Sequence, residues 1–146
     1  LLIHDLDLFW ALTEGRIADM RVVAYASQTS MSDSVQVWID LVDGRGASFL
    51  VSRVAPHKRR RLVAHGPHYW LEANLLDRTA HLWKDAEEVP LALPASYDAL
   101  SAEQEHFLQC IRTGTPSLLS LEYVYAVMVW AWQVEALAQR SLAFTR

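Results

Sequence analysis

The first eight residues read Leu1-Leu2-Ile3-His4-Asp5-Leu6-Asp7-Leu8. In a helix, His4 and Asp7 stand one turn apart and project from one side, while most other positions are apolar and belong in a core. Burying a histidine and a carboxylate costs free energy unless they meet partners or take part in chemistry. We therefore expect a functional site first of all at this helix.

The apolar pattern of this helix begins with a leucine, and no capping residue precedes it. We therefore expect the sequence to be a piece of a longer protein. Its 146 residues, 52% hydrophobic and 21% charged, predict one globular domain over residues 1–146.

Net charge and cysteine content limit the partners and the compartment. A formal charge of −4 argues against nucleic acid or an anionic membrane as a partner. The single cysteine, Cys110, cannot form an internal disulfide, which fits a cytoplasmic protein. The longest apolar run, residues 124–132, is too short to cross a bilayer.

The middle of the chain alternates apolar and polar residues with the period of a strand. Val35, Val37, Ile39 and Leu41 would lie on one face, and the residues between them on the other. A turn at 43–46, with two glycines, predicts a hairpin with a partner strand over 47–54. Further short strands are expected over 20–27, 60–64, 69–75 and 79–83.

The last third has the period of helices. Ser101 and Gln104 form a potential capping box, and Gly114 followed by Pro116 predicts the end of that helix. A longer helix is expected from about 121 to 139, apolar on most faces and therefore largely covered. Together the elements predict an α+β fold with an open, mainly antiparallel sheet and helices packed on one face.

Large side chains on the strands, such as Trp38 and Phe49, leave two interpretations of the second sheet face. The six tryptophans either complete the core or form a subunit interface on the open face. In the second case we expect a homodimer or higher oligomer with two-fold contacts through the sheet.

With these elements in place, the chain resembles the C-terminal domain of the Gfo/Idh/MocA oxidoreductases. In that family a helix with the pattern Asp-x-x-x-His-x-x-Asp enters the substrate pocket, and an open sheet and two closing helices follow. His4 and Asp7 match the second half of this pattern, and its first aspartate would fall one position before Leu1. The resemblance continues through the hairpin at 40–52, the strand and turn at 61–66, and Glu105, Phe107, Ile111, Gly114 and Pro116.

Two segments are similar to a narrower group of members, which oxidise nucleotide-linked amino sugars. They are residues 3–7 and residues 52–54, the latter followed by Lys58, Arg60 and Arg61. The chain departs from its relatives at Asn74, where many carry an acidic residue, and at 141–144, which lack the usual glycine-valine ending.

The resemblance implies a full-length dehydrogenase that passes hydride between a carbon of a sugar, cyclitol or nucleotide sugar and NAD or NADP. An N-terminal Rossmann domain would hold that cofactor. This chain has no Gly-x-Gly-x-x-Gly motif, and the lysine of the Glu-Lys-Pro motif of that domain is also absent. We therefore expect this chain to bind no cofactor and to be inactive alone.

For His4 the resemblance implies the role of general base, because a neutral imidazole can accept the proton of a sugar hydroxyl. The alternative is a buried structural histidine. Asp7 would orient His4 or bind a substrate hydroxyl. Alternatively, Asp5 and Asp7 are acids favoured near a helix N-terminus by its dipole.

The run Lys58-Arg59-Arg60-Arg61 is the one basic cluster. On a strand its members alternate between faces, so at most two could contact one ligand. It is either a solvated edge strand or, with Arg53, Lys58 and Arg60, an anion site for a diphosphate. No stripe of basic and aromatic residues accompanies it, which argues against nucleic acid.

The sequence gives little support for a metal site or for a hydrolase site. The histidines at 57, 65, 68 and 81 lack companion ligands at metal-site spacing, so no metal is predicted. The sequence has no Gly-x-Ser-x-Gly elbow of a hydrolase. The competing hypothesis is a non-catalytic α+β module that uses its open sheet face to bind another protein.

Overall fold

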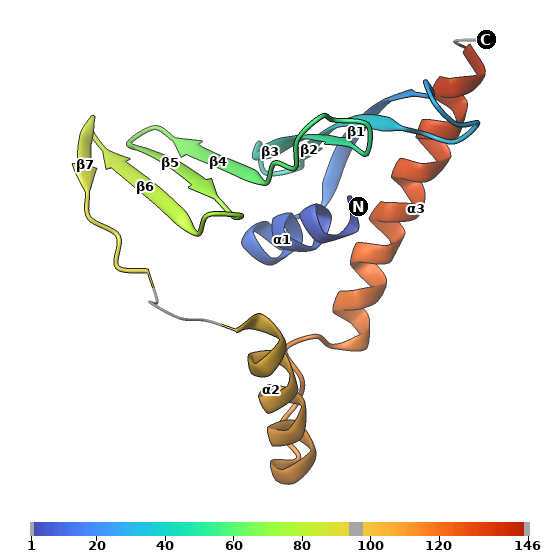
Figure 1. Cartoon of the computed structure of the whole chain (residues 1–146). Coiled ribbons are helices and arrows are strands. Elements are labelled where there is room, and N and C mark those ends of the chain that lie inside the picture. Colours follow the sequence, from blue (N-terminus) through green and yellow to red (C-terminus); the bar gives the residue numbers. More distant parts are fainter. Residues whose placement is uncertain (1, 94–97, 145–146) are drawn as a thin grey trace. The chain divides into compact units, whose positions relative to one another are not determined.

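The computed structural model describes residues 2–93 and 98–144 of the chain (Figure 1). The elements in chain order are α1 (Ile3–Thr13), β1 (Ile17–Tyr25), β2 (Ser34–Leu41), β3 (Gly46–Ser52), β4 (Arg61–Gly66), β5 (Tyr69–Asn74), β6 (Thr79–Lys84), β7 (Glu87–Val89), α2 (Ala99–Thr113) and α3 (Leu121–Phe144). They confirm the α+β class with open antiparallel sheets. The strands form two sheets, in the orders β1-β2-β3 and β4-β5-β6-β7, and β7 is a strand that the sequence pattern did not indicate.

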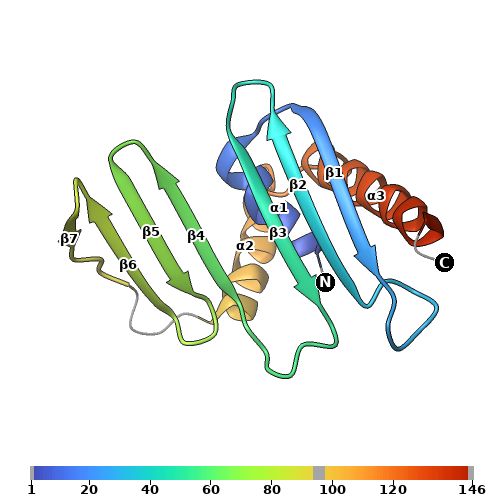
Figure 2. The ribbon, with the colours of Figure 1, turned by 90° about the horizontal axis from the view of Figure 1, so that it is seen from above.

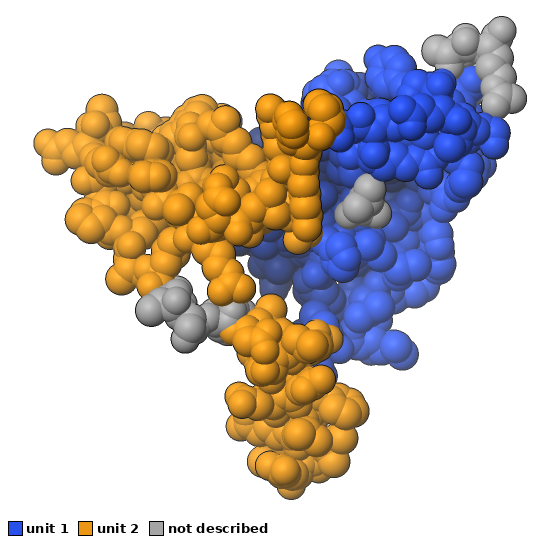
Figure 3. Space-filling view, in the orientation of Figure 1, with its two compact units in different colours: residues 1–55, 116–146 blue, residues 56–115 orange. Residues whose placement is uncertain are grey.

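The described residues divide into two compact units (Figure 3). The first contains residues 1–55 and 116–146, and the second contains residues 56–115. The first unit therefore joins the two ends of the chain and contains α1, α3 and the three-stranded sheet.

Alternation along β2 places its apolar residues against the helices. Val37 and Ile39 are completely buried, whereas the neighbouring Trp38 lies on the opposite face, paired with Arg21 of β1 and Ser48 of β3. Within this unit α1 and α3 lie on the same face of the sheet (Figures 1 and 2). The predicted two-faced strand, and helices on one face of this sheet, are confirmed.

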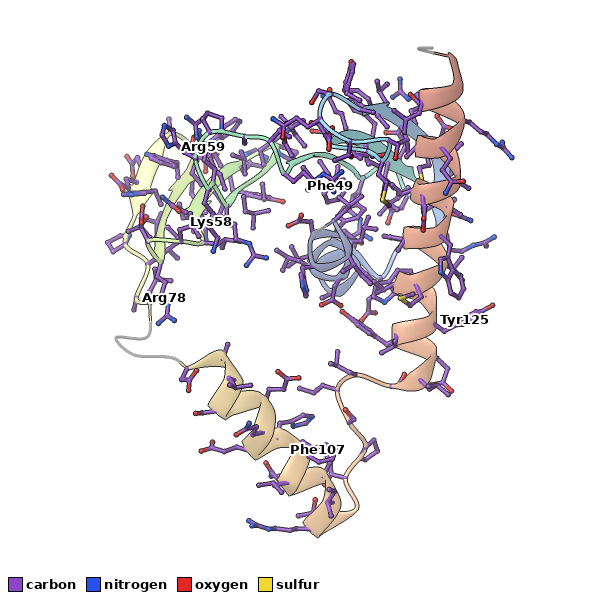
Figure 4. All side chains as sticks on the ribbon, turned by 45° about the vertical axis from the view of Figure 1, so that its right-hand side comes forward. Phe49, Lys58, Arg59, Arg78, Phe107 and Tyr125 are labelled. Atoms are coloured by element: carbon purple, nitrogen blue, oxygen red, sulfur yellow. The ribbon has the colours of Figure 1, made fainter. Side chains whose placement is uncertain are left out.

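Aromatic rings join α1, the sheet and α3 in the core of the first unit. The Phe9 ring centroid lies 5.7 Å from that of Phe49 on β3, and Trp10 lies 4.9 Å from Trp130 on α3. Figure 4 shows Phe49 on the helix side of the sheet. Part of the aromatic content thus completes the core.

α1 ends where the sequence predicted. Glu14 adopts the left-handed conformation (φ 46°) and donates its N–H to the carbonyl oxygen of Trp10. Gly15 is buried against the side chain of Leu41, where a Cβ would collide. Glycine at this position therefore lets the backbone pass close to Leu41 of β2 just before β1 begins.

α3 is covered on one side only, so the expectation of a largely covered helix is wrong. Val127, Trp130, Val134 and Ala138 form a buried stripe at helical spacing. Leu121 and Tyr125 on its first turns are 82% and 63% exposed. The prediction failed because apolar composition alone does not show how many sides of a helix pack against other residues of this chain.

α2 begins earlier than the predicted capping box indicated. The N-cap is Asp98, whose carboxylate accepts the N–H of Leu100 and the hydroxyl of Ser101. Ser101 therefore lies inside the first turn as a partner of the cap, and the capping-box prediction is wrong. The predicted end is confirmed, since Gly114 caps the helix in the left-handed conformation (φ 68°).

Candidate functional site

The candidate site begins at α1, whose packing leaves His4 accessible. Leu6 is completely buried, while His4, on another side of the helix, is exposed. Among the described residues His4 has no hydrogen-bond or ion-pair partner. The imidazole is thus not a structural histidine of this core, and its nitrogens are open to a ligand.

Asp7 is held in place by a residue far away in the sequence. The Tyr123 hydroxyl of α3 donates to Oδ1 of Asp7 over 2.6 Å and also lies 3.2 Å from the Asp7 carbonyl oxygen. Burial of the phenol and its hydrogen bond to Asp7 raise the pKa of Tyr123 to about 12. Sequence reasoning missed Tyr123, because no local pattern links residues 116 positions apart.

Replacing Tyr123 with phenylalanine tests this anchor. We expect the free energy of unfolding to fall by about 1.5 kcal/mol, because a hydrogen bond to a charged group is lost. A folded pKa above that of free tyrosine stabilises the fold below pH 10, and this contribution is lost as the pH rises through about 12. Chemical denaturation measures the first effect and absorbance titration of the phenols measures the second.

The matched control for that variant is Tyr125→Phe, since Tyr125 is 63% exposed on the same helix. Equal stability of the Tyr123→Phe variant and the wild type would show that the hydrogen bond to Asp7 does not hold α1 against α3.

Arg53, a predicted anion contact, is paired with a buried carboxylate. Its Nε donates to Oδ1 of Asp33 over 2.8 Å, and a second guanidinium nitrogen contacts the Thr29 hydroxyl. The Asp33 side chain is 1% exposed and that of Arg53 41% exposed. Arg53 therefore neutralises a buried charge, and only part of its guanidinium is open to a ligand.

Asp33 also closes the loop between β1 and β2. Its Oδ2 accepts the backbone N–H groups of Gln28 and Ser27 over 2.6 and 2.7 Å and that of Thr29 over 3.1 Å. The hydrogen bond from Gln28, then those from Ser27 and Arg53, hold the pKa of this carboxyl well below its usual range, against the opposing effect of burial.

This lowered pKa predicts an acid-sensitive loop. A carboxyl whose folded pKa lies below its unfolded value stabilises the fold above pH 4, and the contribution falls as the pH decreases towards the folded pKa. In Asp33→Asn we expect lower stability at pH 7 and a smaller loss between pH 5 and pH 2 than in wild type. Denaturation experiments at pH 5 and at pH 2 test this prediction, and Asp19→Asn, at an exposed position, is the control. Parallel pH profiles of the Asp33→Asn variant and wild type would contradict this role.

A cavity of about 610 Å³ lies within the first unit, beside α1. Leu6 from α1, Val134 and Gln139 from α3, and Asp33 and Arg53 contribute to its wall. Neither His4 nor Asp7 lines it. The cavity thus contains one of the predicted site residues, Arg53, but the structure does not bring Arg53 and His4 together there.

The basic run lies mostly outside the strands. Lys58 and Arg60 are exposed and precede β4, which begins at Arg61, one residue later than predicted. Figure 4 labels Lys58 in this run. Arg61 pairs with Glu72 of β5 over 2.6 Å. In a strand, Lys58 and Arg60 would share a face because they are two residues apart, and both belong to the second unit.

Two other histidines, His65 and His81, make local contacts in the second sheet. His65 stacks on Trp70 at 5.4 Å, and His81 lies beside Trp83 and within 2.8 Å of Glu88. Within the described ranges, no three histidine, cysteine or acidic side chains are grouped as a metal site. Among the residues that the structure describes, no helix is both long enough and apolar enough to cross a bilayer.

The solved structures that the chain matches include oxidoreductases. The chain matches the aldose-aldose oxidoreductase from Caulobacter crescentus with a TM-score of 0.77 and 17% identity, over 99% of this chain and 44% of that chain. It matches biliverdin reductase from Synechocystis sp. PCC 6803 with a TM-score of 0.78 and 14% identity, over 94% of this chain and 45% of that one. The fold, with the His-x-x-Asp helix beside an open sheet, is that of the C-terminal domain of the Gfo/Idh/MocA oxidoreductases.

At higher sequence identity, the chain is similar to UDP-N-acetylglucosamine 3-dehydrogenase from Acidithiobacillus ferrooxidans. The identity is 31% and the TM-score 0.92, over 97% of this chain and 47% of that enzyme. The chain therefore spans about half the length of the solved relatives that it matches. No family model and no curated protein matches the sequence.

Proposed function

We propose that this chain is the substrate-binding domain of an NAD(P)-dependent oxidoreductase that acts on a nucleotide-linked amino sugar. The observation that carries the proposal is the 31% identity to a UDP-N-acetylglucosamine 3-dehydrogenase over 97% of the chain. The exposed imidazole of His4, one turn from the anchored Asp7, agrees with this chemistry.

In the proposed reaction His4 is the general base. The imidazole takes the proton of a sugar hydroxyl while the carbon that bears it loses hydride, so the alcohol becomes a ketone. Bound nicotinamide would supply the hydride acceptor. We assign the dinucleotide site to an N-terminal half, because the described residues contain no glycine-rich strand-turn-helix unit.

Asp7 is a positioning residue in this proposal. Its carboxylate accepts from Tyr123, which fixes one oxygen relative to α3. The second oxygen is free to accept a hydrogen bond from a substrate hydroxyl or from His4. Because α1 and α3 share the aromatic core, the geometry of this carboxylate depends on the packing of both helices.

Lys58 and Arg60 are the proposed contacts for the diphosphate, with a lesser part for Arg53. Lys58 and Arg60 are exposed and have no ion pair among the described residues. An arginine fork suits phosphate oxygens, and a lysine adds a point charge. The ion pair of Arg53 with Asp33 leaves less of that guanidinium for a ligand.

The direct test is an assay of the full-length protein. Incubation with UDP-N-acetylglucosamine and NAD or NADP should raise absorbance at 340 nm, with free N-acetylglucosamine as the comparison for the diphosphate contacts. Reduction of NAD or NADP with the free sugar, but not with the nucleotide sugar, would contradict the proposed substrate class. An upstream reading frame without a glycine-rich βαβ unit, together with no turnover, would overturn the enzyme proposal in favour of a binding module.

We also propose that two copies meet through the open face of the β1-β2-β3 sheet. Leu50 and Tyr25 on this face are 73% and 55% exposed, beside the half-buried Trp38. Leu50→Glu should weaken the dimer at least tenfold in sedimentation experiments, because it places a charge in an apolar interface. Leu12→Glu, at a 61% exposed position on α1, is the control. A wild-type protein that stays monomeric at high concentration would contradict the proposal.

A further inference from the structure

The hydroxyl of Tyr123 forms hydrogen bonds with a single residue among those that the structure describes. Both of its contacts are on Asp7, at 2.6 Å to Oδ1 of the carboxylate and at 3.2 Å to the backbone carbonyl oxygen. The ring is half-buried and packs against the core of the first unit. A phenylalanine would fill the same space, so packing alone does not account for the phenol oxygen.

Ser120 fixes the position of Tyr123 at the start of α3. The Ser120 hydroxyl, directly before the helix, accepts the N–H of Tyr123 over 3.2 Å, and its carbonyl oxygen accepts that of Val124 over 3.0 Å. These are the hydrogen bonds of an N-cap, which stabilises the first turn of a helix. Tyr123 thus projects from a capped turn and is able to hold a second group in place.

The hydrogen bond from Tyr123 leaves two groups open on α1. Among the described residues, neither Oδ2 of Asp7 nor the imidazole of His4 has a hydrogen-bond partner. The two residues are three positions apart and lie on one side of the helix. Because Oδ1 is bound to α3, the carboxylate no longer rotates freely, and Oδ2 keeps one direction relative to His4.

We propose that Tyr123 is a positioning residue of the dehydrogenase reaction, which occupies one oxygen of Asp7 so that the other stays aligned with His4 and the sugar hydroxyl. This inference rests on the proposed function, which makes His4 the base. An unrestrained aspartate samples several rotamers, and ordering it during each turnover would carry an entropic cost. A carboxylate that is already ordered avoids this cost, and a misplacement of about 1 Å lowers the rate about a hundredfold.

The phenol acts here only as a donor. Burial and the hydrogen bond to Asp7 raise the pKa of Tyr123 to about 12, so the hydroxyl keeps its proton throughout the neutral pH range. Tyr123 therefore takes no proton from the sugar in the proposed reaction. Its effect reaches the reacting atoms through the carboxylate of Asp7.

A second anchor of α1 provides a matched control. Arg45, in the turn between β2 and β3, donates from Nη2 to the carbonyl oxygen of Thr13 over 2.8 Å. Thr13 is the last residue of α1, at the opposite end from His4. Loss of either anchor loosens the same helix, but only loss of the Tyr123 hydroxyl releases Oδ1 of Asp7.

The test is a kinetic comparison in the full-length protein, with UDP-N-acetylglucosamine and NAD or NADP. In Tyr123→Phe we expect kcat to fall about 10- to 100-fold, whereas Arg45→Gln should keep kcat within about twofold of wild type. In the Asp7→Ala background, Tyr123→Phe should change kcat by less than about twofold, because its partner is already gone. Equal losses in Tyr123→Phe and Arg45→Gln, or losses that multiply in the double variant, would overturn the inference.

A spectroscopic measurement tests the anchor without the reaction. With fluorotyrosine at position 123 of the full-length protein, the fluorine NMR signal should shift in the Asp7→Ala variant and stay unchanged in Asp5→Ala. A signal that does not respond to Asp7→Ala would overturn the positioning role. A wild-type protein that oxidises no sugar would overturn the proposed function and this inference together. Sugar oxidation with an unchanged kcat in Tyr123→Phe would overturn this inference alone.

Discussion

Replacing His4 with asparagine in the full-length protein is expected to lower kcat for sugar oxidation by about 10²–10⁴-fold, the usual contribution of a general base. The asparagine amide can still form hydrogen bonds but cannot take up the hydroxyl proton. Thermal stability should stay within about 0.5 kcal/mol of wild type, because the ring is exposed and has no partner in the described part of the chain.

The separate effects on kcat and KM distinguish a base from a binding residue. If His4 is the base, kcat and kcat/KM fall together in the variant while KM changes little. His68→Asn is the control, since His68 is exposed and paired with Asp85. A variant with a raised KM and an unchanged kcat would show that His4 only binds substrate.

Replacing Trp130 with alanine is expected to lower the free energy of unfolding by about 3–5 kcal/mol. Trp130 is 6% exposed, and its ring lies 4.9 Å from Trp10 and 5.9 Å from Phe9. The substitution would leave a void between α1 and α3 that the packed rings of Trp10 and Phe9 fill only in part. Urea denaturation of the full-length protein measures the loss.

Trp132 is a matched control two positions along the same helix. Its side chain is 54% exposed, so Trp132→Ala should change stability by about 0.5 kcal/mol or less. Equal losses in the two variants would show that this helix is covered on both sides in the full-length protein. The predicted difference depends on burial alone, because the residue type and the helix are the same.

The main elements of the first unit could be predicted from local patterns. Val37, Ile39 and Leu41 recur at every second position, and the glycines at 44 and 46 mark the turn, so the β2-β3 hairpin follows from period and turn chemistry. The end of α2 followed from Gly114 in the same way. Its start did not, because Asp98 and Ser101 both have capping side chains and only the backbone conformation selects between them.

The sequence by itself determined the α+β class, the resemblance to the oxidoreductase family and the spacing of His4 and Asp7 on one helix. Those features depend on residues close together in the chain, where spacing alone sets geometry. Only the tertiary structure decided that His4 is exposed, that Tyr123 anchors Asp7, and that Arg53 is paired with a buried Asp33. Such pairings depend on which distant segments pack together, and packing, with the desolvation it imposes, has no local signature in the sequence.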